Sequence, residues 1–353
     1  MATKPIIDLS KFAFGTEEIR ALNELTFDDV IKTPEISSLM TVFPGIVFNK
    51  EIGFLGEGGL IGKGGYGCKP SSDNFQISSR KITWAPKSWS TLIEQCFTDL
   101  QSTAAIYSMN TGVDTADFTN TDIMNIVGEA LTNAMKKFIM RLAWFNDTAV
   151  KNFSDSGTLT NDVSVDYFNI LDGLFKQIDI QCTSNAKQKV AIAENAGASF
   201  EAQKMDDTKV QGYLAKLYYQ ASPILRQMQG NVILCTQSFA DSYQRSLSGL
   251  QLETMLANLT DGKSSLSYNG IPIVAMPIWD EMITNYFNNG TKLVNPNRAL
   301  FTNQRVLGLA VDNLNSFENF STWYEKKDRE VYTDIAGKAD VKLMNEKLFV
   351  YAG

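Results

Sequence analysis

The feature that most restricts the fold of this sequence is a glycine-dense stretch within residues 46–86, flanked on both sides by alternating polar and apolar positions. Glycine adopts backbone conformations that other residues avoid, and alternation is typical of strands. The segment 46–86 is therefore predicted to form a long β-hairpin with a flexible tip. The glycines at its centre are Gly53, Gly56, Gly58, Gly59, Gly62, Gly64, Gly65 and Gly67.

The return limb of this hairpin carries strand-favouring apolar side chains with few local packing partners. They are Phe75, Ile77, Ile82 and Trp84. An isolated two-stranded ribbon is only marginally stable in water. We therefore expect contacts with other parts of an assembly to hold the hairpin.

Two nucleotide-binding motifs overlap the glycines and are rejected. Gly62, Gly64 and Gly67 satisfy GxGxxG, but CKPSSDN follows, where a dinucleotide site needs the start of a helix. A phosphate loop is excluded because Glu57 replaces its first glycine and Gly64 stands where a metal-binding hydroxyl is required. Positive backbone angles at a hairpin tip explain these glycines better.

Residues 1–45 are predicted to form an extended arm. They contain Pro5, Pro34 and Pro44 and show only a short helical pattern near Thr16 to Leu25. Their aromatic residues cannot bury themselves locally, so the arm is expected to lie across its own subunit or a neighbour. An ordinary edge strand followed by a linker is the alternative.

The strongest periodic signal runs from Thr121 to about Phe145, where apolar residues recur at helical spacing. One long amphipathic helix is predicted there. From Asp166 to residue 310 helical and strand patterns alternate, which indicates an α/β lobe. The expected helices of that lobe are 165–178, 206–229, 238–259 and 279–287, and its strands are 230–236, 271–276 and 299–311.

The last part of the chain repeats short strand patterns with polar alternation, as in antiparallel sheets. The expected strands are 321–327, 329–335, 339–344 and 347–353. No internal repeat of 20 to 50 residues occurs in the sequence.

Charge and composition exclude several classes of function. The chain has 39 Asp and Glu and 32 Lys and Arg, which gives a net charge of −7. This charge argues against a protein that binds nucleic acid through a basic surface. Histidine is absent, which removes the commonest proton carrier and zinc ligand. The four cysteines are far apart in the sequence, which fits reduced thiols in a cytoplasm. The sequence contains no run of eighteen apolar residues, so no membrane span is predicted.

No catalytic, cofactor-binding or metal-ligating residue is predicted, and no cofactor is expected. Acidic pairs at Asp28 and Asp206 are read as solvated surface charge rather than a cation site. Asp280, at a strand-to-helix junction, is expected to cap a helix N-terminus. Trp323 and Tyr324, beside charged residues, are expected to form a subunit contact.

The order of these elements resembles the Hong Kong 97 type fold of tailed-phage major capsid proteins, which encapsulin shells share. The stretch SYNGIPIVAMPIWDEM followed by NRALFTNQRVLGLAVD is the most family-like part. The resemblance covers nearly the whole chain and carries no catalytic motif. It implies an α+β fold with an N-terminal arm, an extended hairpin loop, a peripheral lobe with a long spine helix and an axial α/β lobe.

The resemblance also implies a division of the chain and a set of contacts. The expected parts are the arm 1–45, the extended loop 46–86, the peripheral lobe 87–164, the axial lobe 165–310 and peripheral return strands 311–353. The candidates for contacts between subunits are Gly62, Lys63, Tyr66, Phe75, Trp84, Trp323 and Tyr324. Some relatives join a loop lysine to an asparagine covalently, and the nearest candidates here are Lys63 and Asn345.

As a function, the resemblance implies a structural protein, not an enzyme, that assembles in the host cytoplasm and resides in the virion. Pentamers and hexamers of the chain are expected to close an icosahedral head around double-stranded DNA. Separate scaffolding, portal and decoration proteins are expected partners, no membrane is expected, and contact with DNA should be weak and non-specific.

Three alternatives remain open at the level of sequence. An encapsulin-type compartment has the same fold and holds protein cargo. A soluble α/β enzyme using carboxylates would be a small oligomer with a saturable ligand. Another virion component, such as a tail or decoration protein, would lack the hairpin and the long helix together.

Overall fold

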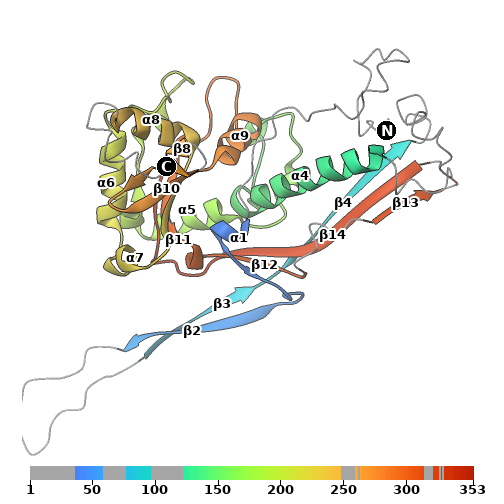
Figure 1. The fold of residues 1–353 in the computed structure, drawn as a ribbon, viewed down its shortest axis with the longest axis horizontal. Helices are drawn as coiled ribbons and strands as arrows, with labels where there is room; N and C mark the ends of the chain where they lie inside the picture. Colours follow the sequence, from blue (N-terminus) through green and yellow to red (C-terminus); the bar gives the residue numbers. More distant parts are fainter. Residues whose placement is uncertain are drawn as a thin grey trace, which may run out of the picture.

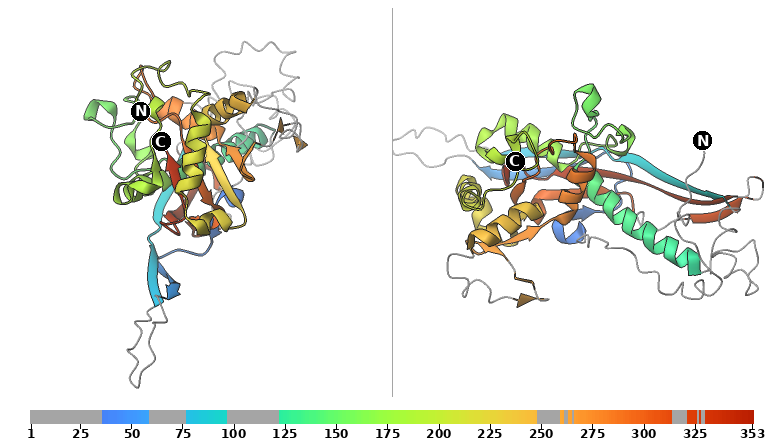
Figure 2. Two further views of the ribbon diagram at one scale, coloured as in Figure 1. Left: turned by 90° about the vertical axis from the view of Figure 1, so that its left-hand side faces the viewer. Right: turned by 90° about the horizontal axis from the view of Figure 1, so that it is seen from above.

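The computed structural model describes residues 36–58, 77–96, 122–247, 259–260, 263–264, 266–313, 321–325, 327 and 330–353. Figure 1 shows a body of helices and sheets at one end, long strands and a helix running away from it, and a two-stranded ribbon projecting below. Figure 2 shows the ribbon leaving the body in two further views. The mixed α+β character predicted from the sequence is confirmed.

A five-stranded sheet contains the longest strand of the described chain. Its members are β1 (Thr41–Phe43), β4 (Lys87–Cys96), β12 (Leu307–Val311), β13 (Ser321–Glu325) and β14 (Glu330–Leu343). β14 is antiparallel to β4, β12 and β13, and β1 is parallel to β12. The strands β4 and β14 form the long two-stranded extension that leads away from the body in Figure 1.

A six-stranded sheet forms the centre of the body, in the order β5-β15-β11-β6-β10-β9. The strands are β5 (Lys189–Val190), β6 (Asn231–Cys235), β9 (Ser267–Tyr268), β10 (Ile271–Ala275), β11 (Ala299–Asn303) and β15 (Val350–Ala352). β10 is parallel to β6, because α8 (Gln237–Leu247) connects them as a crossover.

Both faces of this sheet are buried, and the two-residue period of the strands separates them. Ile233, Phe301 and Val350 point into a core covered by α6 (Val210–Gln220) and α8. Leu234, Leu300 and Tyr351 point into a second core, shared with α5 (Leu174–Ser184) and α9 (Pro277–Tyr286). Since that second core also includes residues of β12 and β14, it joins the two sheets.

The long predicted helix is confirmed as α4 (Asp122–Trp144). Its C-terminal part is anchored in the shared core, where the Trp144 ring lies 4.7 Å from the ring of Trp279 on α9. The remaining α-helices of the described residues are α1 (Ile36–Leu39) and α7 (Pro223–Gln227). Short three-ten turns occupy Phe153–Asp155, Val165–Tyr167, Ala186–Gln188, Ala193–Ala196 and Gln304–Val306.

The predicted hairpin is present as the two strands of the ribbon, β2 (Lys50–Gly58) and β3 (Ile77–Trp84), which pair antiparallel. A smaller two-stranded pair joins β7 (Leu259–Thr260) to β8 (Lys263–Ser264). The glycine-dense tip and the helical pattern near Thr16 lie outside the described residues. In the part of the chain that the structure describes, no helix is long and apolar enough to cross a membrane.

The predicted division of the chain differs from the observed sheets. β15 falls in the range 311–353, expected to return to the peripheral lobe, yet it lies between β5 and β11 in the six-stranded sheet. β12 begins inside the range 165–310 but belongs to the five-stranded sheet, as does β1 of the arm. Long-range pairing decides sheet membership, and alternation within one strand does not encode its partner.

Three predicted elements are also corrected. The helix expected over 165–178 begins only at Leu174, because the backbone at Gly173 is extended and its N–H donates to the carbonyl of Asn146 at 2.7 Å. The helix expected over 238–259 does not reach Leu259, which lies in β7. The two strands expected over 329–335 and 339–344 are the single strand β14, in which Gly337 pairs with Trp89 without a break.

Candidate assembly surfaces

The β2/β3 ribbon has two chemically different faces. Residues directly opposite each other in an antiparallel pair share a face. Ile52 faces Ile82, and Phe54 faces Arg80, whose guanidinium carbon lies 4.6 Å from the Phe54 ring centroid. These residues form an inner face, because Ile52, Phe54 and Ile82 pack against the small core at the root of the ribbon.

The outer face of the ribbon combines an ion pair with an uncovered leucine. The Lys81 ammonium lies 2.8 Å from the Glu51 carboxylate, and this contact lowers the pKa of Glu51 below its usual range. Leu55, on the same face, is 81% exposed. Phe48, just before β2, is 78% exposed, and Ile77 at the start of β3 is 51% exposed. So much uncovered apolar surface on a thin projection is typical of a protein contact site.

The root of the ribbon, in contrast, is fixed within the subunit. The Trp84 side chain is fully buried among Ile46, Ala310 and Met344. The ring fits there because Gly308 on β12 has no side chain: a methyl group at that position would come within 3.0 Å of the Trp84 ring.

A buried carboxylate supports the same root. The Asp340 carboxylate on β14 accepts a hydrogen bond of 2.7 Å from the backbone N–H of Ala85, the residue that follows β3. Burial raises the pKa of Asp340, while the Ala85 hydrogen bond and the ammonium of Lys342 at 3.8 Å oppose that shift. Asp340 therefore supplies an acceptor at the point where the chain leaves the five-stranded sheet for the ribbon.

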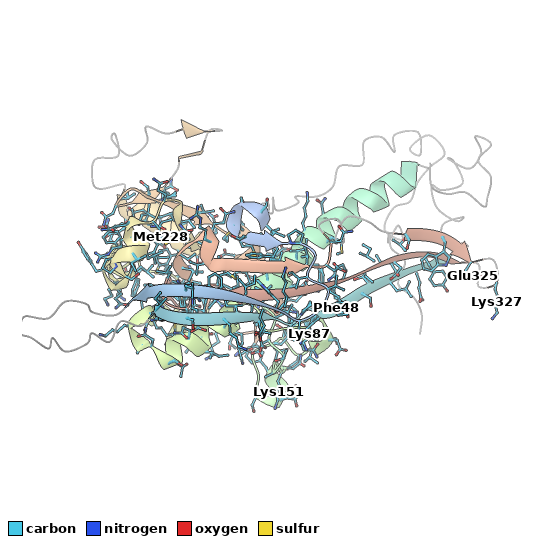
Figure 3. The ribbon with its side chains drawn as sticks, turned by 90° about the horizontal axis from the view of Figure 1, so that it is seen from below. Phe48, Lys87, Lys151, Met228, Glu325 and Lys327 are labelled. Carbon is cyan, nitrogen blue, oxygen red and sulfur yellow. The ribbon has the colours of Figure 1, made fainter. Side chains whose placement is uncertain are left out.

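The other strand of the ribbon is tied down by a neighbouring lysine. The Lys338 ammonium lies 5.2 Å from the ring centroid of Phe48 and donates a hydrogen bond of 3.3 Å to the carbonyl of Val47. Figure 3 shows Phe48 and Lys87 where the ribbon leaves the body, with Glu325 and Lys327 at the far end of the long sheet. The root is thus rigid on both strands, and the shaft beyond it is exposed.

The structure corrects one predicted contact residue and gives the positions of two others. Trp84 is 0% exposed, so its side chain is not available to a neighbouring subunit, because it completes the core at the ribbon root. Trp323 on β13 is 44% exposed, and its ring stacks on that of Tyr332 at 5.7 Å. Tyr324 also lies on β13, but its side chain is outside the described part, and so are Gly62, Lys63, Tyr66 and Phe75.

Sequence reasoning missed several exposed apolar residues that the structure brings out. Leu55 and Phe48 lie in the predicted hairpin, where alternation alone did not show which face would be covered. Tyr219 at the end of α6 is 70% exposed, and Ile224 on α7 is 58% exposed. Both residues belong to helices that contribute to the core shared by α6 and α8.

The acidic candidates are explained by local structure. Asp206 accepts hydrogen bonds from the backbone and hydroxyl of Thr208 and pairs with Lys209, which lowers the pKa of Asp206. Among the described residues, no group of three His, Cys, Asp or Glu side chains could hold a metal ion.

Asp280 caps a helix, as predicted, but a different one from its own. It stands in the first turn of α9 and accepts a hydrogen bond of 2.7 Å from the backbone N–H of Gln237, the first residue of α8. Burial raises the pKa of Asp280 to about 6, although hydrogen bonds from Gln237 and Ser238 oppose the shift. The carboxylate thus links two helices that cover opposite faces of the six-stranded sheet.

Comparison with known proteins identifies the fold. No family model matches the chain, and no curated protein matches its sequence. Among solved structures, a chain of the cyanophage A-1(L) capsid asymmetric unit matches with a TM-score of 0.56 and 11% identity, over 94% of this chain and 95% of that chain.

Two further structures match over similar lengths. A chain from Gordonia phage Cozz gives a TM-score of 0.53 at 10% identity, covering 93% of this chain and 88% of that one. A chain from Mycobacterium phage Ogopogo gives 0.52 at 9% identity, covering 96% and 98%. The resemblance to tailed-phage capsid proteins is therefore confirmed as a likeness of fold that extends over nearly the entire chain.

Proposed function

We propose that this protein is the major capsid protein of a tailed phage, and that pentamers and hexamers of it form the icosahedral head around the double-stranded DNA genome. The observation that carries the proposal is the end-to-end match of its fold to a chain of a phage capsid asymmetric unit. The protein would act as a structural subunit of the virion, assembled in the host cytoplasm, and not as an enzyme.

The surface of the subunit supports assembly as its function. A two-stranded ribbon has too little buried surface to be stable alone, and its outer face exposes Leu55 to water. A neighbouring copy would cover this leucine and Phe48, and burial of a leucine-sized side chain contributes about 1.5–3 kcal/mol. Ribbon contacts repeated around a shell would then stabilise every subunit interface.

Each part of the chain has a role in this proposal. The ribbon within 46–86 is the extended loop, α4 is the spine helix, and the five-stranded sheet is the body of the peripheral lobe. The six-stranded sheet with its helices is the axial lobe around the five-fold and six-fold axes. The arm 1–45 would cross the same or a neighbouring subunit.

Other partners follow from the same proposal. A separate scaffolding protein would guide assembly, and correct shells formed by the chain alone would count against it. Portal and decoration proteins would complete the head. DNA would be held only by weak, non-specific contacts, because a net charge of −7 per copy repels phosphates.

Sedimentation and electron microscopy of the expressed protein test the proposal. We expect closed shells of megadalton mass containing nucleic acid in the phage, and Leu55→Glu should reduce their yield. Shells filled with a cargo protein would instead support an encapsulin-type compartment. A monomer or small oligomer at every salt concentration tested, also when the scaffolding protein is present, would rule out a shell protein.

A further inference from the structure

Arg141, in the last turn of α4, is surrounded by aromatic rings, and its Nε has no hydrogen-bond partner among the described residues. Its guanidinium carbon lies 5.3 Å from the ring centroids of Phe138 and Phe168 and 5.4 Å from that of Tyr167. Its buried Nε has no hydrogen-bond partner, and no ion pair involves Arg141 within the described ranges. Aromatic faces attract a cation, but they do not satisfy its N–H donors.

A second buried arginine shows how the same chemistry is normally completed. Arg298 is 6% exposed and lies 4.3 Å from the Phe175 ring centroid. Its Nε donates to the carbonyl of Asn295 at 2.9 Å, and its Nη2 donates to that of Val294 at 3.3 Å. Arg298 therefore finds hydrogen-bond acceptors within its own subunit, whereas the buried Nε of Arg141 has none among the described residues.

Carboxylates on the elements around Arg141 have partners of their own. Asp147, shortly after α4, pairs with Lys176 at 2.9 Å. Glu281 pairs through Oε1 with Lys137, one turn earlier on α4, at 2.6 Å, although its Oε2 is buried without a hydrogen-bond partner. Asp166, beside Tyr167, accepts from the hydroxyl of Ser164 at 3.2 Å. Burial lowers the pKa of Arg141, while the phenol groups of Tyr286 and Tyr167 oppose the shift. Arg141 itself is only partly buried, and the neighbouring Tyr167 is 59% exposed, so the site reaches the surface of the subunit although Nε is buried.

We propose that the guanidinium of Arg141, in this aromatic cradle, is a docking point for a side-chain carboxylate of a second copy of the chain. This inference rests on the proposed function, since it needs an assembly in which copies touch. A guanidinium whose rotation is restricted by rings matches the planar fork of a carboxylate. Each copy carries 39 acidic residues against 32 basic ones, so neighbours present spare carboxylates.

The surroundings favour a carboxylate over nucleic acid. A DNA backbone is bound by several cations that neutralise successive phosphates. Here Lys137, one turn away on the same helix, is neutralised by Glu281, so Arg141 would act alone. A single cation among apolar rings can bind a single carboxylate, and the rings would exclude water from that carboxylate and orient it.

Arg141→Met and Arg305→Met test the inference as a matched pair. Methionine keeps the apolar stem and removes the charge, and Arg305 is an exposed arginine outside the cradle. We expect Arg141→Met to leave the melting temperature of the dissociated subunit unchanged or higher. It should raise the concentration needed for half-maximal assembly at least about tenfold, whereas Arg305→Met should not. Arg141→Lys, which keeps the charge, should assemble better than Arg141→Met.

The contrary results are equally clear. Unchanged assembly of Arg141→Met would overturn the inference and leave the proposed function intact, and so would a loss of subunit stability, which would make Arg141 a purely internal support. In a density map of the particle, an Asp or Glu of a neighbour within 4 Å of the guanidinium would support it. DNA, or another segment of the same chain at that place, would overturn it. Failure of the wild type to assemble even with the scaffolding protein present would remove both proposals.

Discussion

The β2/β3 ribbon and the β6/β11 pair are both antiparallel, yet only one of them is completed by its own chain. All five residues of β11 are buried, because helices cover both faces of the six-stranded sheet. Most of β3 is exposed until Trp84 enters the core at the root. The subunit itself therefore covers this pair in the body on both faces, whereas the described part of the ribbon keeps apolar side chains exposed.

This contrast separates folding from assembly within one subunit. Substitutions in the body and at the ribbon root should change the free energy of unfolding of the dissociated subunit. Substitutions along the outer face of the shaft should change assembly and leave the subunit intact. The following predictions are arranged from the largest expected effect on the subunit to the smallest.

Trp84→Ala should have the largest effect, lowering the free energy of unfolding by about 3–5 kcal/mol, because it empties the core at the ribbon root. Denaturant unfolding of the dissociated subunit measures it. Trp323→Ala is the matched control: this side chain is 44% exposed and should cost only about 1 kcal/mol, mostly from its stacking on Tyr332. If both substitutions lowered the free energy of unfolding equally, the buried ribbon root would be no more important for stability than the exposed surface.

Asp280→Asn should remove a pH dependence of the free energy of unfolding that arises in the body of the subunit. The pKa of Asp280 is about 6 in the folded subunit and near 3.8 when unfolded, so the folded state binds the proton more tightly. The stability that protonation contributes is present below about pH 4 and is lost as the pH rises through 6, with an amplitude on the order of 3 kcal/mol. Unfolding curves between pH 4 and 8 should show this slope in the wild type.

The corresponding slope should be absent in Asp280→Asn, which keeps an oxygen acceptor for the N–H of Gln237. Glu51→Gln on the exposed shaft is the control and should leave the wild-type slope unchanged. If Asp280→Asn retained the full slope, the titrating group would have to be another carboxylate.

Asp340→Ala should loosen the root without unfolding the subunit, at a cost of about 1–2 kcal/mol, because the buried N–H of Ala85 would lose its acceptor. Hydrogen exchange should become faster at Ala85 and along β3. Asp340→Asn retains an acceptor and should protect these amides almost as well as the wild type. Unchanged exchange in the alanine variant would mean that the Trp84 core alone fixes the ribbon.

Leu55→Ser should have the smallest effect on the subunit, within about 0.5 kcal/mol, since the side chain is already 81% exposed. Assembly should nevertheless weaken, which light scattering during shell formation measures. Leu309→Ser on β12, where the side chain is 1% exposed, is the matched control and should destabilise the subunit itself. Normal assembly of Leu55→Ser would show that the outer face of the ribbon stays uncovered in the particle.

Local patterns in the sequence predicted the elements better than their partners. The periodicity of α4 and the alternation in β2 and β3 are properties of neighbouring residues, and both predictions are confirmed. The insertion of β15 between β5 and β11 depends on contacts across most of the chain, and no local pattern encodes it. Asp280 lies in the first turn of α9, as its position predicted, but the hydrogen bond that it accepts from Gln237 of α8 depends on long-range folding that no local pattern shows.

The predicted contact residues show a similar limit. Trp84 and Trp323 are the same residue type in strand patterns, yet one is buried and the other is 44% exposed. The space for Trp84 exists because Gly308, far away in the sequence, has no side chain. The cradle of Arg141 likewise combines α4 with the three-ten turn Val165–Tyr167, which spacing alone could not bring together.

The position of β15 has a consequence for synthesis on the ribosome. Within the described sheets, β5 pairs with β15 alone, and β11 lies between β15 and β6. The strand β5 leaves the ribosome early and has no strand partner until residues 350–352 are made, a wait on the order of ten seconds at ordinary translation rates. During translation the nascent chain therefore carries an unfinished sheet, in which β5 and β11 lack their shared neighbour until β15 is made.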